Sequence, residues 1–466
     1  MRRKSCIDFI LDLEMHGIKL GLEKIRLLLA ELGSPQLHYP CVLVGGTNGK
    51  GSVTAILAET LARAGYRCGR YTSPHLVSFA ERICLNNRPI PAAALERGAT
   101  RARAAIRRVV ASGRYEAPCT FFEATTAIAL DYFARAGVDA AVLEVGMGGR
   151  FDATNAIDPI LSAITNIELD HERYLGTTRT AIAGEKVGIA RAGVPLVVGR
   201  TDEEPLTAIR AGCERAGAFL YEAERRVRAE LIDGPGDRRV PPAAATAFTG
   251  ARGTLASAGE WVRFSSERRV YGPLQLGLAG RHQIDNAVTA IATLERLEEA
   301  GFRLGAEMIE AGLERVRWPG RLEHLPGRPL ILLDGAHNPA GARALASYLV
   351  EKSYDDLTLV FGAMQDKSIA PMAEALFPLA RRVVLTRSPN RRSAYPQALR
   401  ESLASLHPAL AVAEDPAEAL DAALALTSPG GVICVCGSLY LVGSVRELST
   451  VRQRRRRPRP AVAAAF

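Results

Sequence analysis

The sequence predicts an α/β protein of two domains: a P-loop-type domain with a mostly parallel sheet, followed by a smaller Rossmann-like α/β domain. Short apolar runs alternate with segments of helical periodicity from Cys41 to about Gly199, and the same alternation restarts at Leu330. Between the two regions, Trp318-Pro-Gly-Arg321 predicts a linker, because proline and glycine both stop helices. We therefore place the domains at residues 1–316 and 317–450, with a disordered tail at 451–466.

The first domain begins with helical segments and continues with strands. Residues 5–33 carry apolar side chains at helical spacing, with Gly17 and Gly21 interrupting them. The apolar run 41–44 predicts a buried strand, and the segment 53–64 predicts the helix that follows it. Further strands are expected at 67–72, 140–145, 161–166 and 194–198.

The middle of the chain is less regular. A turn-rich break at 234–242 interrupts residues 200–270, where we expect short antiparallel strands flanking the central sheet. Residues 286–301 predict a helix that returns to the first domain. The second domain repeats the alternation, with strands expected at 330–333, 357–361, 382–386 and 432–436.

Composition and charge favour an ordinary globular protein. Of 466 residues, 48% are hydrophobic and 23% charged, and no apolar run is long enough to span a bilayer. The formal charge is +9, but removing the six arginines of the tail lowers it to +3, so the basic character is local. We therefore expect no nucleic-acid partner and no membrane partner. We also expect a monomer, although the sequence leaves the oligomeric state open.

The N-terminal segment and the cysteine usage both bear on the cellular compartment. The basic start of the chain is followed by Asp8, Asp12 and Glu14, which argues against a secretory signal and a transit peptide. Eight cysteines are scattered without a C-x-x-C pair, a usage that fits reduced thiols. Both observations favour the cytoplasm.

The rest of the chain is organised around a glycine-rich turn after the first strand, Gly45-Gly-Thr-Asn-Gly-Lys-Gly-Ser52. Strand, glycine loop and helix together can hold phosphates, because loop N–H groups point inward and the helix N-terminus adds partial positive charge. Lys50 places a cation beside the terminal phosphates. The usual P-loop has glycine at position 44 and a hydroxyl directly after the lysine, whereas this chain has Val44 and Gly51. The alternative is a tight strand–helix turn without a ligand.

The short loop 46–52 resembles that of the Mur ligase superfamily, and its Gly-Lys-Gly ending resembles the folate branch, the folylpolyglutamate and dihydrofolate synthases. Matching motifs occur from residue 17 to residue 440, so the resemblance covers nearly the whole chain, and the arginine-rich tail departs from it. The resemblance implies an ATP site, whose expected contacts are Thr47, Asn48, Gly49, Lys50, Gly51, Ser52, Asn286, Arg321 and Asp334.

Glu144, His171 and Lys186 each allow more than one interpretation. Glu144 ends an apolar run, where a carboxylate is costly unless it is paired or metal-bound. His171 follows another strand, although a lone histidine is more often a core or surface residue. Lys186 lies in an apolar helical segment, and in the simplest interpretation its ammonium reaches solvent. The resemblance implies instead two Mg²⁺ ions bound by Ser73, Glu144, His171 and a carbamate on Lys186.

The chemistry is consistent with that carbamate, because a desolvated lysine loses its proton more easily and the free amine can add carbon dioxide. Ser73 belongs to Thr72-Ser-Pro-His-Leu76, which matches a family motif. Because Gly51 has no hydroxyl to offer after Lys50, the hydroxyl of Ser73 would supply that oxygen ligand to magnesium. Ser52 is the alternative ligand.

The resemblance also implies substrate contacts. The segment 120–123 matches a pterin-contacting motif whose aromatic rings can stack on the pterin, although the start of a helix would also explain it. The motif 361–367 fits the family as well, and we assign it no role. Expected contacts to the pterin are Thr120, Phe121, Phe122, Glu123, Phe151, Asp152 and Ala153, and those to the glutamate are His337 and Ser438.

These motifs predict an ATP-dependent amide ligase of folate metabolism, with Lys50, Lys186, His171 and His337 as catalytic side chains. The predicted reaction adds L-glutamate to dihydropteroate, or to the γ-carboxyl of a folate polyglutamate, through an acyl phosphate. One alternative is a Mur-type ligase acting on a cell-wall nucleotide precursor, and the folate motifs argue against it. The other is a non-catalytic nucleotide-binding module, and the metal-site residues argue against that.

Overall fold

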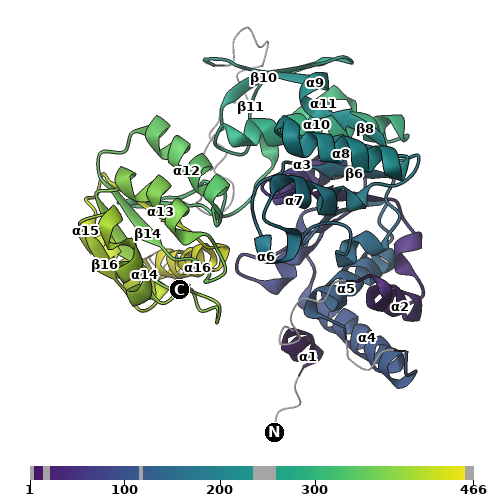
Figure 1. The fold of residues 1–466 in the computed structure, drawn as a ribbon, viewed down its shortest axis with the longest axis horizontal. Coiled ribbons are helices and arrows are strands. Elements are labelled where there is room, and N and C mark those ends of the chain that lie inside the picture. Colours follow the sequence, from purple (N-terminus) through teal and green to yellow (C-terminus); the bar gives the residue numbers. More distant parts are fainter. Residues whose placement is uncertain (1–4, 14–20, 115–118, 235–258, 457–466) are drawn as a thin grey trace, which may run out of the picture. The chain divides into compact units, whose positions relative to one another are not determined.

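The computed structural model describes residues 5–13, 21–114, 119–234 and 259–456 (Figure 1). Within them the chain forms two compact units and passes from the first to the second between Trp318 and Pro319. Gly17, most of the expected turn-rich break at 234–242 and residues 457–466 of the expected tail lie outside the described residues. No helix in the described ranges is both long and apolar enough to cross a membrane.

An eight-stranded sheet forms the centre of the first unit. Its strands are parallel except at one edge, where β3 and β4 pair antiparallel. The strands expected at 41–44, 67–72, 140–145, 161–166 and 194–198 are confirmed and form its core. In order across the sheet the strands are β4 (Arg88–Pro89), β3 (Ile83–Leu85), β2 (Cys68–Tyr71), β5 (Ala140–Glu144), β1 (Cys41–Gly45), β6 (Leu161–Ile164), β7 (Pro195–Val198) and β8 (Phe219–Glu222).

Helices cover both faces of this sheet. In β1, Cys41 and Leu43 point to one face and Val42 and Val44 to the other, because successive side chains of a strand alternate. The first face packs against α1 (Cys6–Asp12), α2 (Glu23–Glu31), α4 (Ala92–Ala111), α5 (Phe121–Ala136), α7 (Arg179–Lys186) and α8 (Glu203–Ala216). The second face packs against α3 (Lys50–Arg63), α10 (His282–Glu299) and α11 (Gly305–Arg315).

The antiparallel strands expected within 200–270 are confirmed, and they form a sheet of their own. Its order is β11 (Val270–Gln275), β10 (Trp261–Ser266), β9 (Val227–Leu231). Strand β9 contacts α10 and strand β11 contacts α11. The small sheet therefore extends the core on the second face of the first unit. Two short helices, α6 (Glu172–Leu175) and α9 (Ala223–Arg226), follow β6 and β8 in the chain.

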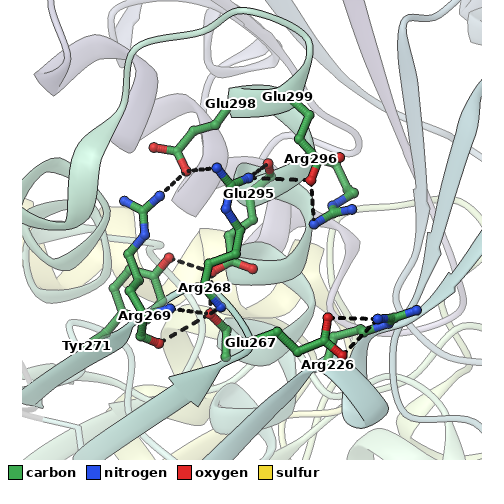
Figure 2. Close-up of polar contacts among 10 residues, drawn as sticks. Arg226, Glu267, Arg268, Arg269, Tyr271, Glu295, Arg296, Glu298 and Glu299 are labelled. Carbon is green, nitrogen blue, oxygen red and sulfur yellow. Dashed lines mark hydrogen bonds and ion pairs between the residues drawn. The ribbon is translucent and has the colours of Figure 1, made fainter.

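A polar network joins the β10–β11 hairpin to the C-terminal half of α10 (Figure 2). Glu295, which is 3% exposed, accepts hydrogen bonds from the hydroxyls of Tyr271 (2.8 Å) and Ser266. The guanidinium of Arg268 donates to the backbone carbonyl of Glu295 (2.9 Å). Burial and the neighbouring carboxylate raise the pKa of Tyr271, which keeps its phenol a hydrogen-bond donor. Glu299, by contrast, is a half-exposed partner of Arg268 at the rim of the network.

We predict that Glu295→Ala lowers the free energy of unfolding by about 2–3 kcal/mol, because two hydroxyl donors lose their buried acceptor. The matched control is Glu299→Ala, which breaks the ion pairs of a half-exposed carboxylate with Arg268 and Arg296 and should cost less than about 0.5 kcal/mol. Urea unfolding followed by circular dichroism measures both variants. Equal losses in the two variants would contradict a special role for Glu295.

The second unit contains a six-stranded sheet, parallel except for its first strand. The strands expected at 330–333, 357–361, 382–386 and 432–436 are confirmed. Across the sheet the order is β12 (Glu323–Leu325), β13 (Leu330–Leu333), β17 (Val432–Cys436), β14 (Leu357–Phe361), β15 (Arg382–Leu385) and β16 (Leu410–Val412). The last strand in the chain, β17, thus lies between β13 and β14. The strand order of the parallel sheet reverses at this place.

The helices of this unit form two groups. Helices α12 (Pro339–Lys352), α13 (Ile369–Leu376) and α14 (Pro396–Leu403) contact one another in sequence, and α15 (Pro416–Leu426) contacts α16 (Leu439–Arg456). Right-handed crossovers account for this grouping, because the chain moves across the sheet in one direction from β13 to β16 and then returns to β17.

The last helix corrects the expected start of the disordered tail at residue 451. Helix α16 continues through Arg456. Arginine and glutamine, which make up most of this stretch, are good helix formers. Pro458 follows closely, and a proline disfavours a helical conformation of the residue before it.

Candidate active site

The carboxyl ends of four adjacent strands carry the polar segments singled out by the sequence in the first unit. The glycine loop follows β1, Ser73 follows β2, Glu144 ends β5 and His171 follows β6. Because the strands are neighbours in the order β2-β5-β1-β6 and run parallel, all four segments start from one edge of the sheet. Val44 pairs with Glu144, so the carboxylate lies beside the start of the loop.

Gly49 sets the conformation at which the loop becomes a helix. It precedes α3 with φ of +81°, in the left-handed region that glycine adopts without strain. A Cβ atom at this position would lie 2.1 Å from Oδ1 of Asn286, a buried residue near the start of α10. The structure thus brings Asn286, an expected ATP contact, directly against the loop.

Residues after β6 hold the other side of the loop, a role that was not expected from the sequence. The Asn48 N–H donates to Oδ1 of Asn166 (2.9 Å), and the hydroxyl of Thr47 donates to the carbonyl of Glu168 (3.1 Å). Thr165 Oγ1 donates to the carbonyl of Asn48. The only sequence signal for these contacts is the position of the polar run Thr165-Asn166 directly after a buried strand.

Lys50 is the first residue of α3, and its side chain lies over its own loop. Its Nζ donates to the carbonyls of Thr47 (2.8 Å) and Gly46 (3.1 Å). Ser52, in the first turn of the helix, is buried, and Gly51 is half-buried. A cation at a helix N-terminus and beside loop amides forms a strongly positive, anion-binding surface.

Lys186, the last residue of α7, reaches the same carbonyl from another element. It is 4% exposed, and its Nζ donates to the Gly46 carbonyl (2.7 Å), so the interpretation that it extends to solvent is wrong. Burial, and next the charge of Lys50, lower the pKa of Lys186 to about 7, while Asp170 and Asp152 act in the opposite direction. A sizeable fraction of this amine is therefore neutral, and able to act as a nucleophile, near neutral pH.

Ser73 and Glu144 are in direct contact. Glu144 is buried, and its Oε2 accepts a hydrogen bond from the backbone N–H of Ser73 (3.1 Å). His171 is half-buried, precedes α6 with φ of +52°, and its backbone N–H donates to Oδ1 of Asp170 (2.8 Å). The structure therefore pairs two of the four expected metal ligands, whereas His171 lies in the segment between β6 and α6.

This donor set suits a hard divalent cation in part. Among the residues that the structure describes, no three histidine, cysteine, aspartate or glutamate side chains are grouped as a metal site. Ser73 and Glu144 offer the oxygen atoms that magnesium prefers, and His171 offers an imidazole. A carboxylate formed on Lys186 would supply the further oxygen ligands that the unmodified side chains lack.

The segment 120–123 divides into two pairs with different surroundings. Thr120 and Glu123 form a capping box at the start of α5: the Thr120 hydroxyl donates to Glu123 Oε2 (2.8 Å) and accepts from the Glu123 N–H (3.2 Å). This supports the interpretation of these two residues as a helix start. Phe121 and Phe122 are only half-buried, so their rings are partly available for contact.

Aromatic and cationic groups surround the two phenylalanines. Phe121 lies edge-on to Phe79 (6.0 Å between ring centroids), and the guanidinium of Arg82 is 5.3 Å from its ring. Arg82 Nε donates to Nδ1 of His75 (2.9 Å); burial and this arginine lower the pKa of His75 to about 4, so the imidazole stays neutral. Phe122 lies 6.0 Å from the ring of Tyr71.

The second expected pterin segment, 151–153, is mixed in exposure. Phe151 is 43% exposed, whereas Asp152 and Ala153 are buried. The carboxylate of Asp152 accepts hydrogen bonds from the N–H of Met147 and from the N–H and hydroxyl of Thr154, while burial raises its pKa. Asp152 therefore organises the loop after β5.

In the second unit the expected site residues gather at the end of β13. Asp334 is buried, and its two oxygens accept from the N–H groups of Leu322 and Ala336 (2.9 Å each). Nδ1 of His337 lies 2.8 Å from the Gly335 carbonyl. A Cβ at Gly335 would lie 1.9 Å from Nη1 of Arg321, so the guanidinium rests against this loop.

Ser438 follows the neighbouring strand β17. Its hydroxyl is buried and has no hydrogen-bond partner among the described residues. The preceding Gly437 N–H donates to the Ala336 carbonyl (2.9 Å), which ties the end of β17 to the end of β13. The expected glutamate contacts His337 and Ser438 thus lie on two loops that are hydrogen-bonded to each other.

Comparison with known proteins bears on the alternatives that the sequence left open. Residues 320–439 match the family model "Mur ligase, glutamate ligase domain". The chain is 38% identical, over 96% of its length, to a probable bifunctional folylpolyglutamate synthase/dihydropteroate synthase of Haloferax volcanii, and it spans about half of that relative's length (50%). It is 32% identical, over 92% of its length, to the dihydrofolate synthase/folylpolyglutamate synthase of Bacillus subtilis, of which it covers 95%.

Solved structures agree. Mycobacterium tuberculosis folylpolyglutamate synthase complexed with ADP is similar over 97% of this chain and 100% of that one, with a TM-score of 0.83 and 31% identity. A bifunctional folylpolyglutamate synthase/dihydrofolate synthase with Mn, AMPPNP and L-glutamate bound is similar over 96% of this chain and 98% of that one, with a TM-score of 0.80 and 29% identity.

The chain belongs to the folylpolyglutamate synthase/dihydrofolate synthase family. This confirms the resemblance inferred from the loop 46–52 and the fold expected from it, two α/β units of the Mur ligase type. The residues matched by the glutamate ligase domain, 320–439, begin two residues after the first unit ends at Trp318 and run to the start of α16.

The buried amine of this family member gives a pH-dependent stability of predictable sign. Because the pKa of Lys186 is lowered in the folded protein from 10.5 to about 7, the unfolded chain binds more protons between these values, and stability rises with pH. We predict that wild type gains about 2–3 kcal/mol relative to Lys186→Met between about pH 7 and pH 9, at about 1.4 kcal/mol per pH unit.

The measurement is urea unfolding in carbon-dioxide-free buffers, so that no carbamate forms during the experiment. Lys352→Met, at an exposed lysine of α12, is the control and should follow wild type across the range. Parallel pH profiles for wild type and Lys186→Met would contradict the lowered pKa.

Proposed function

We propose that this chain is an ATP-dependent ligase that joins L-glutamate to dihydropteroate or to the terminal γ-carboxyl of a folate polyglutamate. The observation that supports it most directly is the convergence of Lys50 and Lys186 on the Gly46 carbonyl, at the strand edge that carries Glu144. Two cations beside loop amides suit the phosphates of a nucleotide. Related proteins were solved with ADP and with AMPPNP, Mn and L-glutamate.

In this proposal the first unit binds the phosphates of ATP, and the second unit binds glutamate and contributes Arg321 and Asp334 to the nucleotide. The loop N–H groups and the first turn of α3 bind the phosphates, and Lys50 moves from its own loop carbonyls to the transferring phosphoryl group, whose charge it stabilises. Asp334 keeps its two backbone hydrogen bonds and so fixes the loop that carries Arg321 and His337. The proposed nucleotide contacts are Thr47, Asn48, Gly49, Lys50, Gly51, Ser52, Asn286, Arg321 and Asp334.

The reaction has two covalent steps. A carboxylate oxygen of the pterin substrate attacks the γ-phosphorus of ATP. The bond between that phosphorus and the bridging β-phosphate oxygen breaks, which gives an acyl phosphate and releases ADP. The neutral amine of L-glutamate, placed by His337 and Ser438, then attacks the acyl carbon. The tetrahedral intermediate collapses to the amide, expels inorganic phosphate and releases the amine proton. Excluding water matters throughout, because water would hydrolyse the acyl phosphate.

We propose two Mg²⁺ ions, with Ser73, Glu144, His171 and the carbamate of Lys186 as protein ligands. When bound, such ions neutralise phosphate charge during transfer. The part played by the chain itself is to keep an amine neutral: the nitrogen of Lys186 attacks carbon dioxide, one proton leaves to solvent, and a carboxylate remains. The pKa of about 7 supports this step, because an ordinary lysine would be almost fully protonated.

The pterin site is proposed beside the half-buried rings of Phe121 and Phe122 and the exposed ring of Phe151. Stacking on these rings suits a flat heterocycle. Thr120, Glu123, Asp152 and Ala153 complete the proposed site, the first three by holding the backbone that carries the rings. The proposed partners are small molecules only. We also propose a monomer, which light scattering would test by measuring the molar mass in solution.

The decisive experiment measures ADP formation and product mass with L-glutamate and each acceptor in turn. The acceptors are dihydropteroate, a reduced folate monoglutamate, and a uridine-diphosphate muramoyl substrate of the cell-wall ligases. We expect glutamate-dependent ADP release and a glutamylated product with one or both pterins. Turnover with the muramoyl substrate alone would overturn the proposal.

We predict that Lys50→Ala lowers kcat by about 10²–10³-fold, because one preorganised charge-stabilising group is worth about 3–4 kcal/mol in such a site. Lys352→Ala, which removes an exposed lysine of α12, is the control and should keep the wild-type rate. A folded Lys50→Ala protein with a near-normal rate would mean that the loop is only structural.

We predict that Lys186→Ala is nearly inactive and that acetate or formate partly restores it by occupying the space of the lost carboxylate. Lys186→Arg keeps a cation but cannot form the carbamate, and it should stay inactive with or without these acids. Steady-state rates over a titration of formate measure the rescue. Wild-type activity in the arginine variant would exclude the carbamate.

A further inference from the structure

Gly51 occupies the position at which the usual P-loop has a serine or threonine hydroxyl, and the structure supplies a physical reason for the difference. Gly51 lies in the first turn of α3 and has no positive φ, so its backbone would accept any side chain. A Cβ there would lie 2.8 Å from Cζ2, 2.9 Å from Nε1 and 3.0 Å from Cε2 of Trp318. The indole of Trp318 therefore occupies the place of the missing side chain.

A second contact fixes the indole from the sheet. The guanidinium of Arg70, on β2, lies 4.9 Å from the centre of the Trp318 ring, within cation–π range. Arg70 is 8% exposed, and its nitrogens donate to Asn87 Oδ1 (2.9 Å) and Cys84 Sγ (3.1 Å). Asn87 in turn donates to Glu59 of α3 (2.6 Å), so the arginine that holds the ring is itself tied to the helix that the loop begins.

The path of the chain brings Trp318 to this point. Helix α11 packs against α3 so closely that a Cβ at Gly312 would lie 2.0 Å from Oγ1 of Thr60. Thr60 lies nine residues beyond Gly51, or about 13 Å along the helix. After α11 ends at Arg315, three residues carry the chain back along α3 to its first turn. Trp318 is the last residue of the first unit, and the linker to the second unit starts there.

We propose that Trp318 is a positioning residue of the phosphate loop: its indole fixes the first turn of α3 through Gly51 and thereby links nucleotide binding to the start of the linker. This inference rests on the proposed nucleotide site. The ring fills the space that a side chain at position 51 would need, so adding a side chain there overpacks the contact.

A double-mutant cycle on ADP affinity tests the contact, with isothermal titration calorimetry as the measurement. Gly51→Ala should weaken ADP binding about tenfold or more, equivalent to about 1.4 kcal/mol, because the methyl group displaces the loop or the ring. In a Trp318→Ala background, where the space is free, the same change should cost about threefold or less. Alanine is a better helix former than glycine, so helix propensity cannot account for a loss.

A spectroscopic experiment tests the link to the linker without any change in the loop. The chain has two tryptophans, and Trp261 lies on β10 of the small sheet. In Trp261→Phe, where Trp318 is the only tryptophan, ADP should shift the tryptophan emission in a saturable way with the Kd from calorimetry. In Trp318→Phe, the matched control that keeps a ring but removes the indole, ADP should leave the tryptophan emission unchanged.

The outcomes separate this inference from the proposed function. Additive effects in the cycle, or an emission of Trp318 that ignores bound ADP, would overturn the role of Trp318 while the nucleotide site stands. If the unmodified protein bound no ADP, both the inference and the proposed function would fall. If Gly51→Ala did not fold, the fluorescence titration alone would decide.

Discussion

The site depends on one electrostatic constraint: two lysine ammonium groups from different elements share the carbonyl oxygen of Gly46. Each cation raises the cost of the other, and burial adds to that cost for Lys186. The arrangement is tolerable because Asp152 and Asp170 lie near enough to act on Lys186, and because its amine can lose a proton. An incoming phosphate, or a carboxylate formed on the amine, relieves the same repulsion. The loop is therefore suited to anions before any ligand binds.

Much of this fold could be predicted from the sequence because its central strands are buried on both faces and appear as unbroken apolar runs. The polar residues at the strand ends, from the glycine loop to Asp334, stood out for the same reason. Several strands that were not predicted, among them β4, β8 and β16, lie at sheet edges, are short and keep partly exposed side chains. Apolar runs this short do not by themselves distinguish a strand from a loop, because the segment becomes a strand by pairing with its neighbour.

Contacts between distant residues were the other limit. The capping box of Thr120 and Glu123 has a local spacing and could have been recognised, and the structure supports the helix-start interpretation of those two residues. The burial of Lys186 could not, because a lysine in an apolar helix has the same sequence pattern whether it reaches solvent or a carbonyl. The contact between Gly51 and Trp318 could not be predicted from the sequence either. The two residues are 267 positions apart, and only the return of the chain along α3 brings them together.

Helix α10 connects the small antiparallel sheet to the phosphate loop. Its first turns carry Asn286, which fills the space against Gly49, and its later turns carry Glu295, which anchors the β10–β11 hairpin. The hairpin lies outside the central sheet, yet by holding α10 it supports the helix that carries Asn286 against the glycine loop. Removing this hairpin to obtain a smaller protein would leave the central sheet intact and take away the packing that supports α10 beside the loop.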